Sequence, residues 1–252
     1  MYSIEQVLSS LNESPTKIAI LAILVFTIGF VQYFEGLRIT IRDKRSPLYF
    51  WQHAWYFGHD LTFLLLFPFW FFTVDHWLFK ILCIGCGAFV LIELLVLHLA
   101  VKYERQQIWG RYYDTEVSPA EAWKRGILSY AIGFTIFYTV RLAINDTMCL
   151  ALMMSTNATV AIAPAFLIQE RRDHKGTSTL LAALILTGTA YTFMPPNIGL
   201  FTTLSPTFHQ PWFYSLGALC LCSSAYYFTL SIKYSRKAQP SDTRPAAPSI
   251  LL

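Results

Sequence analysis

The sequence predicts an all-α integral membrane protein in which seven transmembrane helices form one bundle. Hydrophobic residues make up 55% of the 252 residues and charged residues only 13%, whereas a soluble chain carries about 25% charged residues. Seven apolar stretches approach or exceed the roughly 20 residues that cross ~30 Å of hydrocarbon. Backbone polar groups in lipid must be paired within the segment, and barrel strands would be half as long, so these stretches must be helices. They cover residues 17–39, 47–72, 77–101, 122–143, 147–169, 177–197 and 210–233.

The distribution of basic residues predicts the orientation of the bundle. With the N-terminus outside, 16 of the 19 Lys and Arg residues fall at the inner side, and only Lys17, Lys80 and Arg141 fall outside. The positive-inside rule therefore predicts a lumenal or extracellular N-terminus and a cytosolic C-terminus. If the protein is an enzyme, the endoplasmic reticulum is the expected membrane. The net charge of +4 reflects this bias, and no basic patch with interleaved aromatic residues indicates a nucleic-acid partner.

The chain begins with a polar lumenal segment, residues 1–16, which lacks the basic region of a cleaved signal peptide. The membrane domain follows as residues 17–235. Its first span ends with Glu35 one turn before Arg38, a spacing that favours an ion pair with snorkelling side chains.

The second span contains the most informative stretch, residues 51–60. His53 and Asp60 lie seven positions apart and therefore on one helical face with Tyr56, whereas His59 is expected to point about 100° away from Asp60. Asp60 lies about 20 Å from the cytosolic end, near the bilayer midplane. An ionisable group there costs at least ~2.5–3.5 kcal/mol and indicates a functional site. Burial favours the protonated acid, as a general acid requires. The alternative is a helix–helix hydrogen bond to Asn157 or a tyrosine.

The third span carries a second deep carboxylate, Glu93, for which catalysis and structural pairing are equally open. Its Cys83 and Cys86 have redox-motif spacing without the matching context, so buried packing is expected. The inner loop 103–121 is expected to form a cytosolic cap. Two outer sites, Asp75 with His76 and Arg141 with Asp146, are expected to be solvated.

The remaining spans contain no deep carboxylate. The fifth carries Asn157 before Pro164, and a proline that frees backbone carbonyls is common where a helix lines a cavity; Asn157 suits interhelical hydrogen bonding equally well. Outer loop 196–210 is uncharged and aromatic, so it is expected to lie on the interface or to cover a cavity. The seventh span offers Tyr227, and residues 236–252 read as a disordered cytosolic tail.

The ionisable residues do not predict a metal site. His53, His59, Asp60 and His98 have suitable ligand chemistry for zinc or iron. However, His53 and His59 are six positions apart rather than three or four, and membrane hydroxylases use many more histidines. We therefore expect neither a metal nor another cofactor.

Aromatic residues form 16% of the chain and are dense in the second span. Packing and lipid contact account for most of them. An aromatic cavity beside a buried acid would also suit carbocation chemistry, because ring faces stabilise cations by ~2 kcal/mol or more when desolvated.

Several short motifs resemble the small seven-helix terpene cyclases of fungal meroterpenoid and indole-diterpenoid pathways. They cover roughly residues 20–235 and are a basic turn at 42–48, Gln52-His-Ala54-Trp55, Lys102-Tyr103 with Trp109-Gly110, Ser155-Thr-Asn157, and Arg171-Arg172 with Gly176 and Ser178. The resemblance implies acid-initiated cyclisation of a lipophilic prenylated substrate, with Asp60 protonating its terminal epoxide or alkene. It also implies that Trp55, Tyr56 and Tyr227 line the cavity, to which the polar Asn157 adds a substrate contact.

The chain departs from that family at two positions. The family has an acid directly after the Ala-Trp pair, where this chain has Tyr56, and another in the last helix, where residues 210–233 contain none. Asp60 lies one turn later on the same face, and the base that ends the cascade is open, with Glu93 and His53 as further catalytic candidates.

Two other functions remain open. A seven-helix transporter or ligand-binding protein would use Asp60 and His53 as a proton relay, although no internal repeat typical of transporters is visible. A membrane hydrolase would use the same residues to activate water, but the chain offers no evident nucleophile. The oligomeric state is not predicted.

Overall fold

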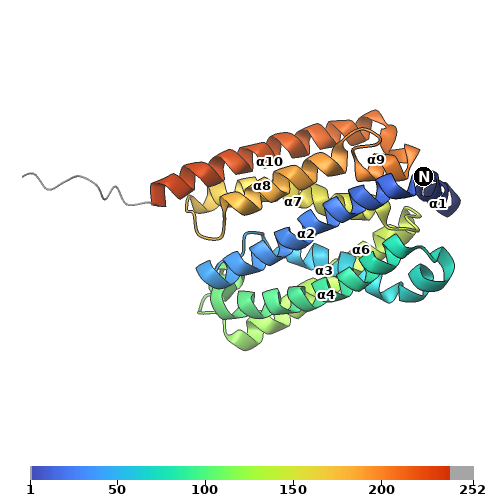
Figure 1. Cartoon of the computed structure of the whole chain (residues 1–252). Coiled ribbons are helices and arrows are strands. Elements are labelled where there is room, and N and C mark those ends of the chain that lie inside the picture. The colour runs from blue at the N-terminus through green and yellow to red at the C-terminus, as the bar shows by residue number, and fades with distance from the viewer. Residues whose placement is uncertain (1, 239–252) are drawn as a thin grey trace, which may run out of the picture.

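In a computed structural model, which describes residues 2–238, the protein is a bundle of long helices joined by short connections (Figure 1). The described residues contain no β-strand. The α-helices are α1 (Ile4–Glu13), α2 (Pro15–Asp43), α3 (Phe50–Leu65), α4 (Trp77–Leu99), α5 (Arg105–Trp109), α6 (Pro119–Ala143), α7 (Leu150–Arg171), α8 (Thr179–Phe193), α9 (Leu200–Leu204) and α10 (Pro211–Ala238). Two π-helices, η1 (Phe69–Val74) and η2 (Ala100–Glu104), and two 3-10 helices, η3 (Gly110–Tyr112) and η4 (Pro206–His209), extend or connect them.

Each of the seven predicted spans contains one long helix: α2, α3, α4, α6, α7, α8 and α10. Five segments are long and apolar enough to cross a membrane: α2, α4 with its extension to Tyr112, α6, α7 and the part of α10 up to Ser235. Helices α3 and α8 are shorter, at 16 and 15 residues. The predicted all-helical class is confirmed for the described residues.

The second span is less regular than the predicted range 47–72. Helix α3 begins only at Phe50, and its regular part ends at Leu65. Pro68 lies just beyond, where its missing N–H and its ring disturb the regular hydrogen-bond ladder. The chain continues as the π-helical turn η1.

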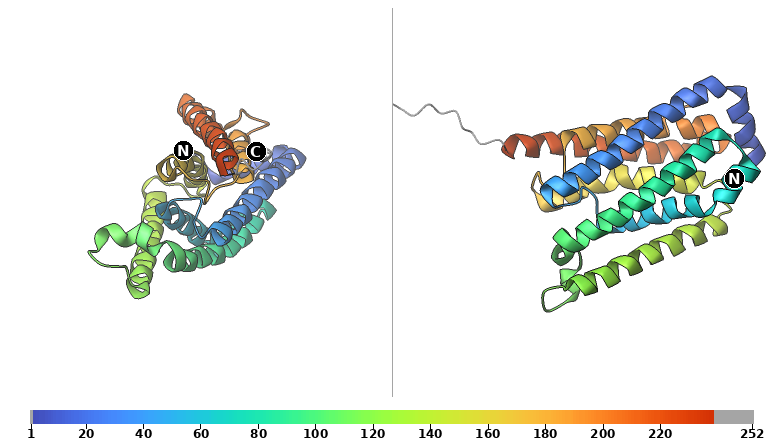
Figure 2. Two further views of the ribbon diagram at one scale, coloured as in Figure 1. Left: turned by 90° about the vertical axis from the view of Figure 1, so that its left-hand side faces the viewer. Right: turned by 60° about the horizontal axis from the view of Figure 1, so that its bottom comes forward.

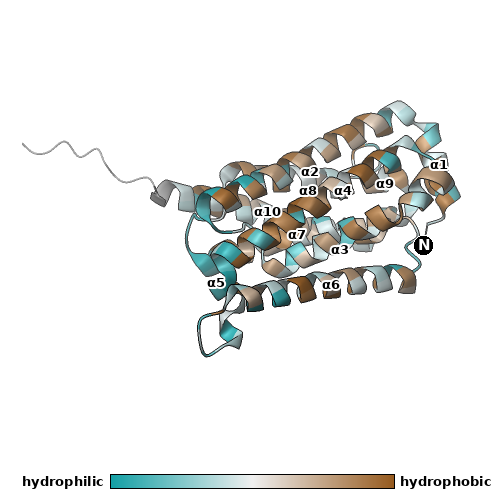
Figure 3. Ribbon diagram, turned by 90° about the horizontal axis from the view of Figure 1, so that it is seen from below, coloured by the Kyte–Doolittle hydropathy of each residue, from teal (hydrophilic) through white to brown (hydrophobic). Residues whose placement is uncertain are grey.

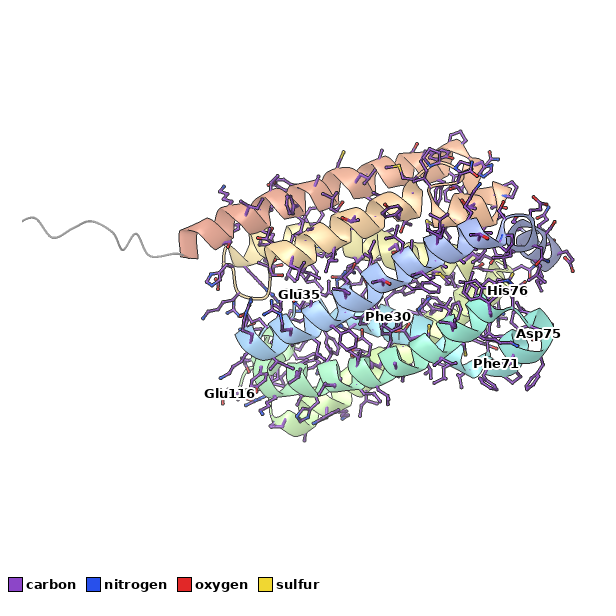
Figure 4. All side chains as sticks on the ribbon, in the orientation of Figure 1. Phe30, Glu35, Phe71, Asp75, His76 and Glu116 are labelled. Atoms are coloured by element: carbon purple, nitrogen blue, oxygen red, sulfur yellow. The ribbon has the colours of Figure 1, made fainter. Side chains whose placement is uncertain are left out.

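The helices pack as two groups with α2 between them. Helix α3 packs against α6, α4 and α7, whereas α10 packs against α8 and α7. Helix α2 contacts α8 on one side and α4 on the other, as Figures 1 and 2 show. Figure 4 places Phe30 of α2 beside α4, and its ring centroid lies 4.7 Å from that of Phe89.

Glycines allow α3 and α6 to touch along their backbones. A Cβ atom added at Gly133 would lie 2.3 Å from the carbonyl oxygen of Ala54, and one added at Gly58 would lie 2.7 Å from that of Gly133. Small residues permit such close approach in membrane bundles. The contact fixes the rotation of α3, which carries most of the candidate site residues.

Polar residues gather at the two ends of the bundle, and the middle is hydrophobic (Figure 3). We call the end formed by residues 42–49, 102–119 and 171–178 the basic end, and the opposite end, which includes α1 and α9, the α1 end. Glu35 and Arg38 form the predicted ion pair near the basic end, with 2.6 Å between Nε and Oε2.

The expectation that Arg141 and Asp146 are solvated was wrong. Asp146 is fully buried and Arg141 only 9% exposed. Asp146 accepts hydrogen bonds from the Tyr2 hydroxyl and from the backbone N–H of Leu152. The N-terminal segment covers it, because α1 is an amphipathic helix that buries Val7 and Leu11 at this end.

The predicted tail begins later than expected, because α10 continues to Ala238. The rest of the tail, residues 239–252, lies outside the described residues.

Candidate functional site

A cavity of about 180 Å³ lies within the bundle, between α2, α3, α4, α7 and α8. Its walls are mostly apolar, and five of the seven predicted site residues line it: His53, Tyr56, Asp60, Glu93 and Asn157. An apolar cavity with a few convergent polar groups is the typical form of a small-molecule site.

His53 and Glu93 form a buried pair across two helices. The Nδ1 atom of His53 on α3 lies 3.0 Å from Oε2 of Glu93 on α4, and their side chains are 7% and 1% exposed. Tyr130 of α6 donates to the backbone oxygen of Glu93 at 3.0 Å and to Oε2 at 3.3 Å. Glu93 therefore makes a structural pair, which is one of the two roles that the sequence left open. It also lines the cavity, so the catalytic role stays a prediction.

Hydrogen bonds lead from this pair to the basic end. The other ring nitrogen of His53, Nε2, lies 2.8 Å from Oγ of Ser46. The backbone N–H of Ser46 donates to Glu104 at 2.8 Å, and Arg171 lies 3.5 Å from the other oxygen of Glu104. With the Nδ1 proton donated to Glu93, Nε2 accepts from the Ser46 hydroxyl.

Asp60 forms a second polar cluster on the same cavity, two turns further along α3. It is 2% exposed. The Tyr33 hydroxyl of α2 donates to Oδ2 at 3.3 Å, and Nδ1 of His59 lies 2.8 Å from Oδ1. His59 was expected to face away from Asp60. That expectation was wrong, because neighbouring side chains on a helix can bend toward each other when both are buried.

Three potential metal ligands meet at this cluster. Single ligand atoms of His59, Asp60 and Cys86 all lie within 4.8 Å of one another, and all three residues are buried. This set differs from the four residues considered from the sequence, since Cys86 comes from α4. The contact between His59 and Asp60 uses Nδ1 of the imidazole, whereas its Nε2 is buried and has no hydrogen-bond partner within the described residues.

The two other candidates on the cavity are held by α7. The Tyr56 hydroxyl donates to the backbone oxygen of Thr156 at 3.3 Å. The Asn157 side chain donates to the backbone oxygen of Met153, one turn earlier on its own helix, at 3.1 Å. The carbonyl oxygen of Asn157 has no hydrogen bond within the described residues and is available to a ligand.

The structure does not bring Trp55 and Tyr227 to this cavity. Trp55 lies two positions from His53, about 200° around α3, and its indole N–H donates to Ser155 Oγ at 3.2 Å. Tyr227 is on α10, which α7 and α8 separate from the cavity, and its hydroxyl lies 2.6 Å from that of Thr177. Neither residue lines this cavity, and their implied contact with substrate stays a prediction.

Aromatic rings form a large part of the cavity wall. Tyr33 stacks on Phe89 with 4.1 Å between ring centroids and lies 6.2 Å from Tyr56. Phe30 and Phe201 add further rings. Aromatic rings thus line the cavity that holds Asp60, and ring faces can stabilise a cation.

Sequence reasoning missed Tyr33 and Cys86. The signal for Tyr33 was present, since Gln32, Tyr33 and Glu35 interrupt an apolar span, and both Gln32 and Tyr33 line the cavity. Comparisons of the chain with protein-family models, curated proteins and solved structures gave no match. The geometry of the cavity therefore carries the functional argument.

Proposed function

We propose that the protein is an integral membrane enzyme that cyclises a lipophilic prenylated substrate by acid-initiated carbocation chemistry. The observation that carries the proposal is a buried carboxyl group, Asp60, on an aromatic-walled cavity that also holds a separate His53–Glu93 pair. A proton donor and a proton acceptor thus lie on one wall, seven residues and about 10 Å apart along α3.

The proposed reaction begins with proton transfer from Asp60 to a terminal epoxide oxygen or alkene carbon. Tyr33 and His59 position the carboxyl group. Opening of the epoxide, or protonation of the alkene, creates a cation whose charge moves along the prenyl chain as new carbon–carbon bonds form. The faces of Phe30, Tyr33 and Phe89 stabilise it without reacting, and the apolar walls exclude water.

The reaction ends when the last cation loses a proton to His53, whose pairing with Glu93 stabilises the resulting imidazolium. The Ser46 hydroxyl, which lies 2.8 Å from Nε2 of His53 and lines the groove at the basic end, is the first relay group for that proton. The proposed reaction requires no cofactor. The cluster of His59, Asp60 and Cys86 acts in it through the Asp60 carboxyl group, which donates a proton.

The proposed topology has seven spans, with the basic end in the cytosol, the α1 end in the lumen and the endoplasmic reticulum as the membrane. The bias of basic residues supports it. In this topology α3 and η1 together form the second span, which ends at Val74. Helix α8 covers about 22 Å, and α9 and η4 continue its path at the α1 end.

The test is expression in a microbial host supplied with a farnesylated phenolic epoxide. Cyclised product is expected from the wild type and a loss of about 100-fold or more from Asp60→Asn. Asp75→Asn is the matched control, because Asp75 is an exposed acid at the α1 end (Figure 4). Undiminished product from Asp60→Asn would refute the assigned role.

A proton-coupled transporter is the second candidate. The buried ionisable groups between the cavity and the basic end, Glu93 with His53 and Glu104 with Arg171, favour it, because such residues inside a membrane often mark proton pathways. Proton uptake by vesicles that contain the protein, abolished by Glu93→Gln and without any product formation, would favour transport over cyclisation.

A further inference from the structure

A second, larger hollow lies on the outside of the bundle at the basic end. This groove has a volume of about 870 Å³, with α6 on one side, α7 on the other and the start of α3 as its floor. Figure 2 shows α6 and the segment before it at the edge of the bundle. The groove is a separate hollow from the cavity around Asp60, although His53 lies between the two and lines both.

The groove changes character along its length. At the basic end it is lined by four arginines and two glutamates: Arg45, Arg111, Arg125, Arg171, Glu104 and Glu170. Further along α6 the lining becomes apolar, with Leu128, Ile132 and Ile136 between 49% and 58% exposed. The distance from Arg125 to Ile136 along the helix is about 16 Å, close to the thickness of one hydrocarbon leaflet.

The inner charges of the groove are already satisfied. Arg171 pairs with Glu104, and Arg45 lies 3.5 Å from Asp173. The Tyr49 hydroxyl donates to Glu170 at 2.9 Å. These residues form the closed back wall of the charged part.

The two outer arginines carry the unmatched charge. Within the described residues, neither Arg111 nor Arg125 has a carboxylate within ion-pair distance. Their guanidinium carbons lie 4.9 and 5.1 Å from the same Tyr112 ring centroid, so the two cations are at most about 10 Å apart. Their side-chain partners are the hydroxyl groups of Tyr112 and Tyr113.

We propose that this groove binds an anionic phospholipid, with its phosphate between Arg111 and Arg125 and one acyl chain along Leu128, Ile132 and Ile136. Guanidinium groups match phosphate oxygens in geometry and charge. The phosphate of a zwitterionic lipid brings an ammonium group that offsets its charge beside the two arginines, whereas an anionic lipid brings net negative charge. A free phosphate would leave the apolar half of the groove unused. Trp51 and Tyr112, both about half exposed, line the same end and suit the headgroup level.

The test uses the full-length protein in nanodiscs or mixed micelles of neutral phosphatidylcholine. Addition of phosphatidylglycerol is expected to raise the unfolding temperature and to leave a bound lipid in native mass spectra. The double substitution Arg111→Gln/Arg125→Gln is expected to weaken this binding about 30-fold, since each basic side chain near an anionic lipid surface strengthens binding about fivefold. Lys124→Gln, which removes one positive charge at an exposed neighbour outside the groove, is the control for loss of basic charge elsewhere and is expected to bind phosphatidylglycerol normally.

Further measurements keep the proposal open to refutation if the double variant is poorly folded. A photoactivatable phosphatidylglycerol acyl chain is expected to label the wild type on α6 near Ile132, and Ile132→Trp is expected to block labelling without a change of charge. Three results would each overturn the proposal. They are stabilisation by inorganic phosphate alone, a rise in unfolding temperature with phosphatidylcholine equal to that with phosphatidylglycerol, and a loss of lipid binding in Lys124→Gln equal to that in the double variant.

Discussion

His53 of α3 and Glu93 of α4 lie 3.0 Å apart and form a buried histidine–carboxylate pair in the middle of the bundle. The pair links two helices and at the same time forms part of the cavity wall. The pair therefore holds two helices together, and its His53 is also the proposed proton acceptor. Experiments can separate these two roles.

The structural role predicts strong energetic coupling between the two residues. Glu93→Leu leaves the His53 ring without its acceptor, while the Tyr130 hydroxyl keeps the backbone oxygen of residue 93, so we expect a cost of about 1–3 kcal/mol in the free energy of unfolding. In a double-mutant cycle with His53→Leu, the double variant should lose at least about 1 kcal/mol less than the sum of the single losses. The free energies of unfolding of the four proteins, measured in mixed detergent micelles, give this coupling energy.

Glu116 provides the control for that cycle. It lies at the exposed basic end (Figure 4), and no hydrogen bond or ion pair joins it to His53. The effects of Glu116→Gln and His53→Leu should add. Additive losses for His53 and Glu93 as well would show that the pair contributes no interaction energy.

The contact between Tyr33 and Asp60 predicts a positioning effect. Tyr33→Phe keeps the ring stacked on Phe89 and removes only the hydroxyl group that donates to Asp60. Product formation should fall about fivefold to tenfold, the value of one hydrogen bond, while the unfolding temperature changes little. Tyr138→Phe on α6 is the matched control. An unchanged rate would mean that Asp60 acts without help from Tyr33.

Much of the fold followed from the sequence because hydrocarbon imposes a simple rule on length and polarity. Each of the seven predicted spans contains a long helix, and Asp60, His53 and Glu93 were selected because each costs free energy in an apolar span. All three line one cavity. The cost of burial thus selected three residues that share one candidate site, without knowledge of their contacts.

The partners of these residues could not be predicted, because they depend on how each helix is rotated against its neighbours. The close approach at Gly58 and Gly133 sets the rotation of α3. This turns His53 toward Glu93 and sends Trp55 toward α7 instead of the cavity. Burial of Arg141 and Asp146 was missed for a related reason, since α1 folds back over residues that a linear reading assigns to an exposed loop.

The helix contact at Gly133 predicts a large effect from one methyl group. Gly133→Ala would place its Cβ 2.3 Å from the Ala54 carbonyl oxygen, so α6 must move away from α3. We expect a loss of about 1–3 kcal/mol in stability and reduced product formation, because α3 loses its support. Gly87→Ala on α4 is the control, since its Cβ would make only an ordinary contact of 3.5 Å with Leu64 and Gly87 does not line the cavity. Equal stability of both variants would refute the backbone contact.

His76 predicts a pH dependence at the α1 end. Burial lowers the pKa of this imidazole below its ordinary 6.5, and its Nδ1 accepts a hydrogen bond from the backbone N–H of Leu78 at the start of α4. The unfolded chain therefore binds a proton more readily than the folded one, so the stabilising contribution is complete above about pH 6.5 and declines as the pH falls. His76→Asn supplies a cap that does not titrate and should flatten the fall in unfolding temperature between about pH 7.5 and 5.5. His174→Asn, at an exposed histidine of the basic end, is the control and should leave this fall in unfolding temperature unchanged. An equal fall in His76→Asn and the wild type would assign the acid sensitivity to another group.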